Sequence, residues 1–351
     1  METVNFYDLT PTELQDFLLS KDIKKFRAQQ LYKWIYGQRV TDFDKMTDIS
    51  KKLRAEFPNM LSLELPKMIT EHISKDGTRK YLFDMGEGKS VESVLIPSGD
   101  RLTLCVSSEV GCNMACKFCY TAKQKLQRRL KASEIIGQLV QVNDKLPEDT
   151  RITNVVFMGM GEPLDNSDEV FKSIEIMHHS WGLNMSRKKI TVSTSGIVPE
   201  MHKVAESGAR LAVSLNGVND EVRSRIMPIN KRWPLKDLLQ ACRDYCDTTG
   251  DRVTLEYVLL KDVTDSIEDA HALYHLTKDI PCKINIIPFN EHPNSGFHRP
   301  SERQIQRFQE ALMDAGSHVL RRKTMGRDIY AACGQLTTVA KQQSNNERTV
   351  V

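Results

Sequence analysis

The sequence predicts an α/β protein: a partial (βα)6 barrel preceded by a small helical N-terminal domain and a β-hairpin linker. Three observations predict this architecture. After residue 101, apolar strand-like segments alternate with amphipathic helical segments, which is typical of βαβ units and a parallel sheet. Residues 66–100 combine β-branched and aromatic runs with glycine-containing turns, which is typical of antiparallel hairpins. Residues 1–65 carry helix-start signals and apolar residues at helical spacing.

The N-terminal segment is expected to be a separate accessory domain. Thr10 and Pro11 predict the start of one helix, and residues 24–36 predict a second. The second helix mixes apolar residues with Lys24, Lys25 and Arg27. Composition alone favours a solvated basic face over an RNA-contacting one.

The barrel is expected to occupy residues 101–336, followed by a polar tail over residues 337–351. Its strands are predicted at residues 103–107, 153–158, 189–194, 210–215, 252–260 and 282–289. Its helices are predicted at residues 133–145, 167–179, 199–206, 234–248, 266–279 and 301–315. In a barrel of this kind, catalytic residues lie at the C-terminal ends of the strands.

Composition limits the location and the partners of the protein. The 49 Lys and Arg residues exceed the 46 Asp and Glu residues by only three, so a nucleic-acid surface would have to be local. The sequence has no apolar run long enough for a membrane span and no secretory signal. We therefore expect a cytoplasmic protein whose eight cysteines serve metal binding or catalysis rather than disulfides.

Cys112, Cys116 and Cys119 are spaced Cx3Cx2C in a short segment after the first barrel strand. Three thiolates can hold a [4Fe–4S] cluster and leave one iron open to a small molecule, whereas such clusters usually have four thiolate ligands. A structural zinc site completed by a residue such as Cys105 is the alternative, but such sites more often use paired CxxC units. The spacing, with aromatic Phe118 before the third cysteine, is the signature of radical S-adenosylmethionine (SAM) enzymes. The sequence therefore predicts a radical SAM barrel that binds a [4Fe–4S] cluster and SAM.

Polar residues recur at the ends of the later strands. The second strand ends in Gly159–Pro163, where glycines admit a ligand close to the backbone and a carboxylate can accept from an ammonium group. The third, fourth and sixth strands end near Ser193, Ser214–Asn216 and Asn290. Their shared position at one end of the barrel makes them candidate ligand contacts.

The sequence resembles the RlmN/Cfr family of radical SAM RNA methyltransferases over nearly its whole length, from about Phe6 to Leu336. The matching segments are Leu104–Ser108, Phe157–Pro163, Met227–Asn230 and Ala331–Leu336. Two positions differ from the usual family pattern. Tyr120-Thr121-Ala122 stands where the family has a small residue and Thr-Gly, and Asn216 stands where it has His.

The resemblance implies methylation of adenosine C2 in 23S rRNA and in the tRNA anticodon loop, with an N-terminal domain that helps to hold RNA. Cys333 falls on the family's methylated cysteine, Cys105 on its partner thiol and Glu92 on its proton acceptor. The family's SAM-contacting positions correspond to Gly161, Glu162, Ser193, Ser214, Leu215, Asn216 and Asn290. An electron donor such as flavodoxin is also implied, and a monomer is the default expectation.

Three alternatives stay open at this point. The first is a methyltransferase that acts on adenine C8, and the second is a zinc-stabilised RNA-binding protein without turnover. The third is a radical SAM enzyme acting on a small molecule. Six Lys and Arg residues in the acid-free segment 117–131, together with the Cys105 and Cys333 pair, speak against the third and favour contact with RNA phosphates.

Overall fold

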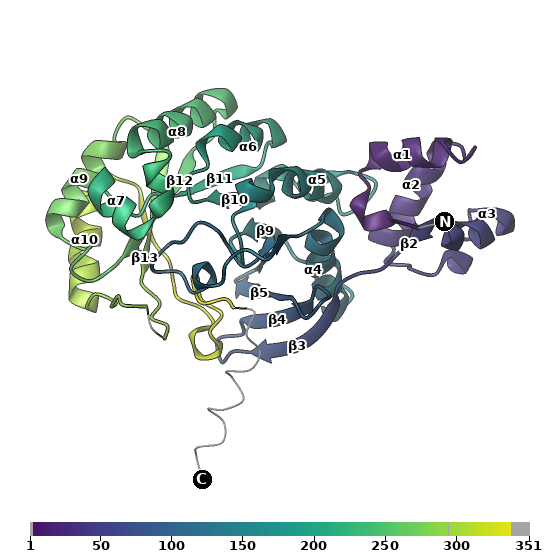
Figure 1. Ribbon diagram of the computed structural model, residues 1–351, viewed down its shortest axis with the longest axis horizontal. Coiled ribbons are helices and arrows are strands. Elements are labelled where there is room, and N and C mark those ends of the chain that lie inside the picture. The colour runs from purple at the N-terminus through teal and green to yellow at the C-terminus, as the bar shows by residue number, and fades with distance from the viewer. Residues whose placement is uncertain (1–2, 294, 338–351) are drawn as a thin grey trace, which may run out of the picture.

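A mixed ten-stranded sheet forms the centre of the computed structural model, which describes residues 3–293 and 295–337 (Figure 1). Its strand order is β14-β13-β12-β11-β10-β9-β6-β5-β4-β3. The strands from β6 to β14 run parallel, and the predicted (βα)6 arrangement is confirmed. Their bounds are β6 (Arg101–Cys105), β9 (Asn154–Phe157), β10 (Ile190–Thr194), β11 (Arg210–Ser214), β12 (Val253–Leu259), β13 (Cys282–Pro288) and β14 (Val319–Arg321).

Helices cover the outer side of this curved sheet (Figure 1). They are α4 (Ala132–Lys145), α5 (Ser167–His178), α6 (Met201–Ser207), α8 (Leu235–Thr249), α9 (Ile267–Thr277) and α10 (Glu302–Asp314). Each lies within two residues of a predicted helix because its apolar residues recur at helical spacing and are buried against the sheet. Helix α7 (Asp220–Ile226) was not predicted. It has seven residues, and most of them are charged.

The predicted hairpins pair with the first barrel strand and so belong to the same sheet as the barrel. Strands β3 (Lys67–Ile73), β4 (Arg79–Asp84) and β5 (Ser90–Ser98) are antiparallel, and β5 pairs with β6 so that Val94 lies opposite Cys105. This pairing places residues of β5 next to the first barrel strand. Glu92, on β5, is therefore near the barrel although it precedes the barrel in sequence.

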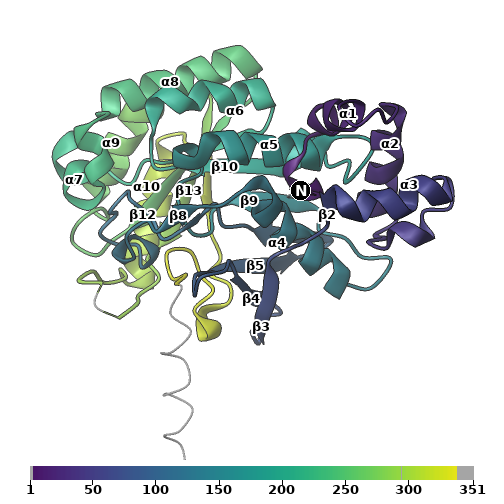
Figure 2. The ribbon, with the colours of Figure 1, turned by 45° about the vertical axis from the view of Figure 1, so that its right-hand side comes forward.

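The N-terminal segment forms helices α1 (Pro11–Leu19), α2 (Phe26–Tyr32) and α3 (Lys51–Glu56), with a short parallel pair of β1 (Val4–Asn5) and β2 (Leu61–Ser62). Figures 1 and 2 show it at one end of the molecule, beside α4 and α5. We propose a domain boundary near residue 65, where β2 has ended and β3 has not begun.

Aromatic side chains join the N-terminal segment to the barrel. The ring of Tyr32 packs against Phe6 and Tyr36 within its own domain and against His179 and Trp181 after α5, at centroid distances of 5.1–6.4 Å. Such ring pairs contribute more to the stability of an interface than the burial of their apolar area alone.

A search of the described residues for membrane-spanning helices finds none of sufficient length and hydropathy.

Candidate active site

Cys112, Cys116 and Cys119 lie on a loop between the short strands β7 (Glu109–Val110) and β8 (Arg128–Arg129). The loop is fixed by backbone hydrogen bonds: the Cys112 amide donates to the Gln124 carbonyl at 3.0 Å, and the Lys117 amide donates to the Ile226 carbonyl at 2.9 Å. Gly111 has φ of +83°, and a Cβ there would collide with the backbone of Lys125. The glycine before the first cysteine is therefore required by the turn.

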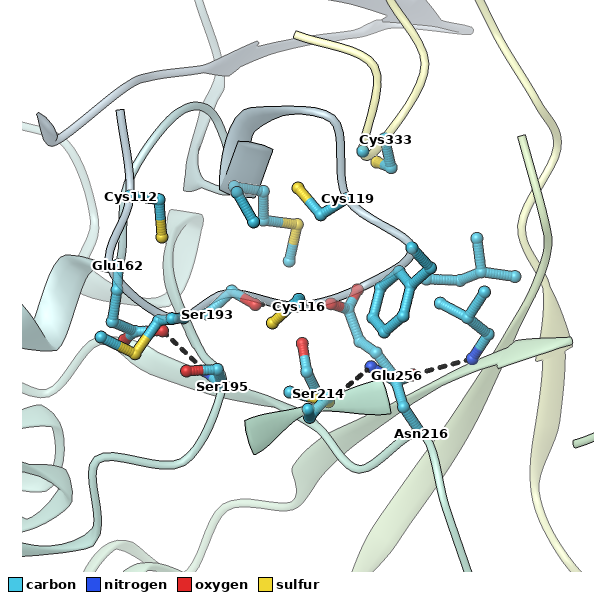
Figure 3. A pocket seen from close by; sticks show the side chains of 18 of the residues that line it. Cys112, Cys116, Cys119, Glu162, Ser193, Ser195, Ser214, Asn216, Glu256 and Cys333 are labelled. Carbon is cyan, nitrogen blue, oxygen red and sulfur yellow. Dashed lines mark hydrogen bonds between the residues drawn. The ribbon is translucent and has the colours of Figure 1, made fainter. Parts of the chain in front are cut away.

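The three cysteines line one cavity at the C-terminal ends of the barrel strands, together with residues from the ends of the other barrel strands and from the Cys333 segment (Figure 3). Of the predicted site residues, the structure brings these to the cavity wall: Cys112, Cys116, Cys119, Gly161, Glu162, Ser193, Ser214, Asn216, Asn290 and Cys333. Leu215, Cys105 and Glu92 are not among its lining residues.

The donor set suits an iron–sulfur cluster. Burial raises the pKa of all three thiols well above the ordinary value, so a bound cation is needed to hold them as thiolates. Among the described residues, no three His, Cys, Asp or Glu side chains converge closely enough to hold a single metal ion. A four-iron cube spreads its ligands much further apart than one zinc ion does, and three thiols around a shared cavity match that demand.

Glu162 is held with its carboxylate in a fixed direction. Its Oε2 accepts from the Ser195 amide at 2.7 Å and its Oε1 accepts from the Leu164 amide at 3.2 Å. Burial raises the pKa of Glu162 even though these amides favour the charged form. Gly161 has φ of +99°, and a Cβ there would lie 2.6 Å from the Cβ of Glu109. The backbone here can therefore be built only with glycine.

The end of β11 divides into cavity-facing and buried positions. Ser214 and Asn216 line the cavity, whereas Leu215 is fully buried and its carbonyl accepts from Arg223 Nε at 2.9 Å. Asn216 has φ of +53°, a left-handed conformation that Asn adopts more readily than most residues. Its Oδ1 accepts from the Val258 amide at 2.8 Å. Asn216 thus shapes the backbone where the family usually carries His.

Cys333 is presented to the cavity by a segment tied to the cluster loop. The Tyr120 amide donates to the Gly334 carbonyl at 2.8 Å, and the Thr121 hydroxyl donates to the Leu336 carbonyl at 2.8 Å. Asn290 Nδ2 donates to the Cys333 carbonyl at 3.3 Å. The segment that departs from the family pattern, Tyr120–Ala122, therefore anchors the Cys333 segment.

The two thiols of Cys105 and Cys333 share a charged neighbour, Arg322. Burial and the nearby Cys333 raise the pKa of Cys105 to about 12, and Arg322 opposes this rise. Burial also raises the pKa of Cys333, and Arg322 again opposes the shift. Arg322 lines the cavity and forms an ion pair with Glu256 at 3.5 Å. In the sequence, Arg322 belongs to a basic patch with Arg321, Lys323 and Arg327 that resembles a phosphate-contacting surface, and no signal marks Glu256 as its partner.

Glu92 is buried and forms an ion pair with Lys80. Its Oε1 is 2.9 Å from Lys80 Nζ, and its Oε2 accepts from the Thr337 amide at 2.9 Å. Burial raises the pKa of Glu92 despite the ammonium group of Lys80. A carboxyl whose pKa is raised toward neutrality is better suited to accept and release a proton.

Glu256 and Ser195 are cavity residues that the analysis did not select. Glu256 is a buried carboxylate on β12 whose Oε2 accepts from the Ser193 hydroxyl at 3.3 Å. A lone acid within the apolar run Val253–Leu260 was the available signal. Among the described residues, the buried Ser195 hydroxyl has no hydrogen bond of good geometry. It lies beside the Glu162 carboxylate at the cavity wall, so it is available to a ligand.

Glu109 lies behind Glu162 and is a neutral acid at neutral pH. Burial, together with the nearby acids Asp165 and Glu162, raises the pKa of Glu109 to about 8, although the Glu162 amide favours the charged form. Within the described part of the chain, Glu109 Oε1 and Asp165 Oδ2 are buried and accept no hydrogen bond from a third group, so one proton held between them satisfies both. Arg129 lies 3.8 Å from Glu109 but 3.0 Å from Asp165, so its ion pair with Asp165 dominates.

This proton makes stability depend on pH. The folded state binds it more tightly than the unfolded state, so the stabilisation is complete below pH about 4.5 and is lost as the pH rises through about 8. We expect the Tm of the holoenzyme to fall by at least about 2–4 °C over that range, the shift for about 1 kcal/mol in a domain of this size. Glu109→Gln mimics the neutral acid and should flatten this dependence. Equal slopes for the two proteins in anaerobic thermal melts would contradict the shared proton.

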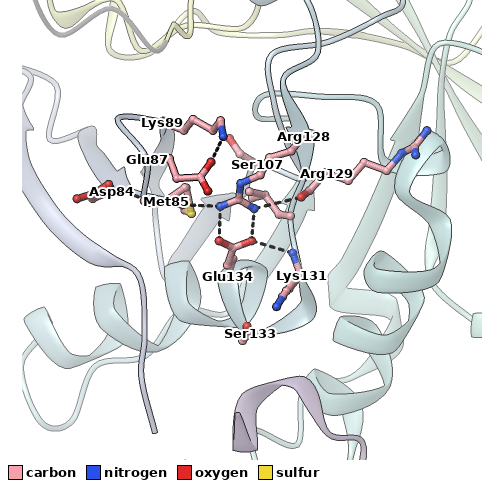
Figure 4. Close-up of polar contacts among 12 residues, drawn as sticks. Asp84, Met85, Glu87, Lys89, Ser107, Arg128, Arg129, Lys131, Ser133 and Glu134 are labelled. Carbon is pink, nitrogen blue, oxygen red and sulfur yellow. Dashed lines mark hydrogen bonds and ion pairs between the residues drawn. The ribbon is translucent and has the colours of Figure 1, made fainter. Parts of the chain in front are cut away.

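The basic segment after the cluster loop is partly used within the fold (Figure 4). Arg128 binds both carboxylate oxygens of Glu134, at 2.6 and 2.7 Å, and donates to the Met85 carbonyl at 2.5 Å. These bonds occupy the guanidinium of Arg128, so Arg128 is not a candidate for the phosphate contact expected of this segment. Lys117 and Lys125 are exposed and remain candidates.

A strand-end cavity with three cluster-type thiols on a βα barrel defines a radical SAM enzyme, and the comparisons agree. The family model described as "Radical SAM superfamily" matches residues 106–274, and "Ribosomal RNA large subunit methyltransferase N-terminal domain" matches residues 4–63. A solved radical SAM methyltransferase from Sphaerobacter thermophilus superposes with a TM-score of 0.90 at 41% identity, covering 95% of this chain and 99% of that one.

Two curated relatives narrow the assignment. Both are described as dual-specificity RNA methyltransferase RlmN. The one from Bdellovibrio bacteriovorus is 61% identical over 97% of this chain and 86% of its own length. The one from Geobacter sulfurreducens is 48% identical over 95% of this chain and 92% of its own length. The chain belongs to the RlmN family of dual-specificity RNA methyltransferases. It is a radical SAM enzyme that uses a [4Fe–4S] cluster and SAM to methylate RNA, which excludes the zinc-stabilised binding protein without turnover.

Proposed function

We propose that this enzyme forms 2-methyladenosine in 23S rRNA and in the tRNA anticodon loop, through a methylated Cys333 and a transient protein–RNA adduct. The observation that carries the proposal is the pair of thiols, Cys105 and Cys333, that flank Arg322 beside the cavity of the three cluster cysteines. A radical SAM enzyme for a small molecule has no need of this second thiol.

The cavity supplies sites for both cofactors. Cys112, Cys116 and Cys119 would hold the cluster, which together with SAM supplies a 5′-deoxyadenosyl radical when bound. The Glu162 carboxylate suits the ammonium group of SAM. The other proposed SAM contacts are Gly161, Ser193, Ser214, Leu215, Asn216 and Asn290. Because the Leu215 side chain is buried away from the cavity, only the backbone of Leu215 could take part.

Two thiols are needed because adenine C2 is too electron-poor to attack a methyl donor. The Cys333 thiolate is nucleophilic enough to take the methyl group. Once a hydrogen atom has been removed from this methyl group, its carbon bonds to C2 and links the RNA to Cys333. Glu92 accepts the proton that leaves C2, and the unpaired electron passes to a one-electron carrier such as flavodoxin. The Cys105 thiolate then attacks the sulfur of Cys333, and the sulfur–carbon bond breaks with its electron pair on carbon. That carbon takes the proton back from Glu92 and becomes the methyl group of the released base, which leaves a Cys105–Cys333 disulfide.

The partners follow from this chemistry. The disulfide and the radical step both need electrons, so we propose a donor such as flavodoxin. The N-terminal domain is proposed to help hold the RNA, which is supported by its match to an RNA methyltransferase N-terminal domain over residues 4–63. We further propose a cytoplasmic monomer.

Nucleoside analysis of 23S rRNA and tRNA tests the proposal. RNA from cells with and without the protein is digested, and methyladenosine isomers are separated by mass spectrometry. We expect 2-methyladenosine in both RNAs only when the protein is present. A C8-methylated product would favour the alternative specificity, and methyl groups confined to one RNA class would remove the other class from the proposal.

A further inference from the structure

Arg223, on α7, is one of the largest fully buried side chains in the protein. In the part of the chain that the structure describes, its guanidinium donates four hydrogen bonds. The acceptors are the carbonyls of Ser195, Ser214 and Leu215 and the Oδ1 of Asn230, at 2.6–3.1 Å. All four acceptors are neutral. A buried guanidinium usually has a carboxylate partner, because removing a charge from water costs free energy.

Arg223 is positively charged, and the nearest acid balances this charge only indirectly, through a hydrogen bond relayed by Asn230. Burial lowers the pKa of Arg223 to about 10, which still leaves it protonated at neutral pH. Asn230 relays the charge, because its Nδ2 donates to Asp220 Oδ1 at 2.9 Å. The same Asp220 oxygen also accepts from the Leu235 amide at 2.9 Å. Among the described residues, Arg223 therefore has no anionic partner in direct contact.

Arg223 joins the ends of two neighbouring strands at the cavity. Ser195 follows β10, and Ser214 ends β11. The backbone of Ser195 is held from both sides, since its amide donates to Glu162 and its carbonyl accepts from Arg223. Among the residues that the structure describes, the buried Ser195 hydroxyl then has no well-aligned hydrogen bond at the cavity wall. Hydrogen bonds thus link Glu162, Ser195 and Arg223 along one side of the cavity.

The local sequence makes room for this arrangement. A Cβ at Gly196 would lie 3.2 Å from Arg223 Nη2, and a Cβ at Gly217 would lie 3.0 Å from the Cβ of Arg223. Gly196 also has φ of +114°. Both strand-end turns therefore leave space that the arginine fills.

The same helix reaches the cluster loop. The Lys117 amide donates to the Ile226 carbonyl, at the last residue of α7, at 2.9 Å. Lys117 directly follows Cys116, and the guanidinium of Arg223 donates to the carbonyls of Ser195 and Ser214, which line the same cavity as Cys116. Reduction adds negative charge to a thiolate-ligated cluster, and a nearby buried cation stabilises the reduced form more than the oxidised form.

We propose that Arg223 is a positioning residue with two effects: it fixes the serine-bearing strand ends that receive SAM, and its buried charge makes the [4Fe–4S] cluster easier to reduce. The inference rests on the cluster assignment to Cys112, Cys116 and Cys119, and it is independent of which RNA is methylated.

The charge effect is tested by the midpoint potential of the reconstituted full-length enzyme, followed by electron paramagnetic resonance under anaerobic conditions. Arg223→Gln should lower the equilibrium constant for one-electron reduction about tenfold, a shift of about 59 mV to more negative potential. Arg225→Gln removes an exposed arginine from the same helix and should leave the potential unchanged. Asp220→Asn removes the remote compensating charge and should shift the potential the opposite way. A potential unchanged in both Arg223→Gln and Asp220→Asn would overturn the charge effect.

The positioning effect is tested by equilibrium dialysis of labelled SAM against the oxidised enzyme, in which SAM is not cleaved. Arg223→Lys keeps the charge but cannot span the strand ends, so it should keep the potential and weaken SAM binding about tenfold. Unchanged SAM affinity in Arg223→Lys would overturn the positioning effect. If Arg223→Gln fails to assemble a cluster, Arg223→Lys and Asp220→Asn still decide both effects. Neither readout uses RNA, so a failure of the proposed adenine specificity would leave these results intact.

Discussion

Replacing Cys333 with Ala should abolish RNA methylation, with a loss on the order of 10⁴-fold or more, because the reaction loses its nucleophile. With methyl-labelled SAM, the wild-type enzyme should carry label on Cys333 before RNA is added, and the variant should carry none. Iron and sulfide content should be unchanged, since Cys333 is not one of the proposed cluster ligands.

Cys282→Ala is the matched control for this substitution. Cys282 begins β13, at the end of the strand opposite the cavity, and is not a cavity-lining residue. Its replacement removes one thiol and should leave protein labelling and RNA methylation intact. Label on protein or RNA in Cys333→Ala at the wild-type level would show that the methyl group does not pass through this residue.

Replacing Cys105 with Ala should convert the enzyme into a trap for its own substrate. The methyl carbon would still bond to RNA, but no positioned thiol would attack the sulfur of Cys333. Positioned groups act at effective molarities of about 10⁵ M or more, so a dissolved thiol cannot replace Cys105 and turnover should fall at least about 10³-fold. The adduct is measured as an RNA-dependent shift of the protein band under denaturing conditions.

The adduct has an internal control. Cys105→Ala combined with Cys333→Ala should give no shifted band, because the attachment point is absent. Digestion of the shifted band followed by mass spectrometry should place the nucleotide on Cys333. Free methylated product at the normal rate, without adduct, would rule out the role given to Cys105.

Much of the barrel was predictable because its strands and helices carry regular apolar periods. The Cx3Cx2C spacing and the strand-end glycines are also local signals, and the structure gathers those residues around one cavity. The seven-residue α7 was not predicted because most of its residues are charged, and nothing in the sequence distinguishes the one that is fully buried, Arg223, from the others. Its environment is created by Ser195, Ser214 and Leu215, which no local pattern connects to it.

Residues whose role depends on distant partners were equally hard to find. Arg322 stands in a basic segment that suggests a surface, yet it pairs with Glu256 beside Cys333. Cys105 and Cys333 are separated by most of the barrel, and each alone resembles an ordinary buried cysteine. The family resemblance connected them, whereas composition and spacing could not. The contact of Glu92 with Lys80 likewise depends on strand register, which the sequence left open.

The hydrogen bonds from Tyr120 and Thr121 to the Cys333 segment fix the relative position of two parts of the active site. The cluster loop and the thiol proposed to receive the methyl group come from distant parts of the sequence, yet these bonds join their backbones directly. A displacement of the cluster loop should therefore carry the Cys333 segment with it. The source of the radical and the methyl group that the radical attacks are thus held at one separation by the backbone itself, even when the surrounding strand ends move.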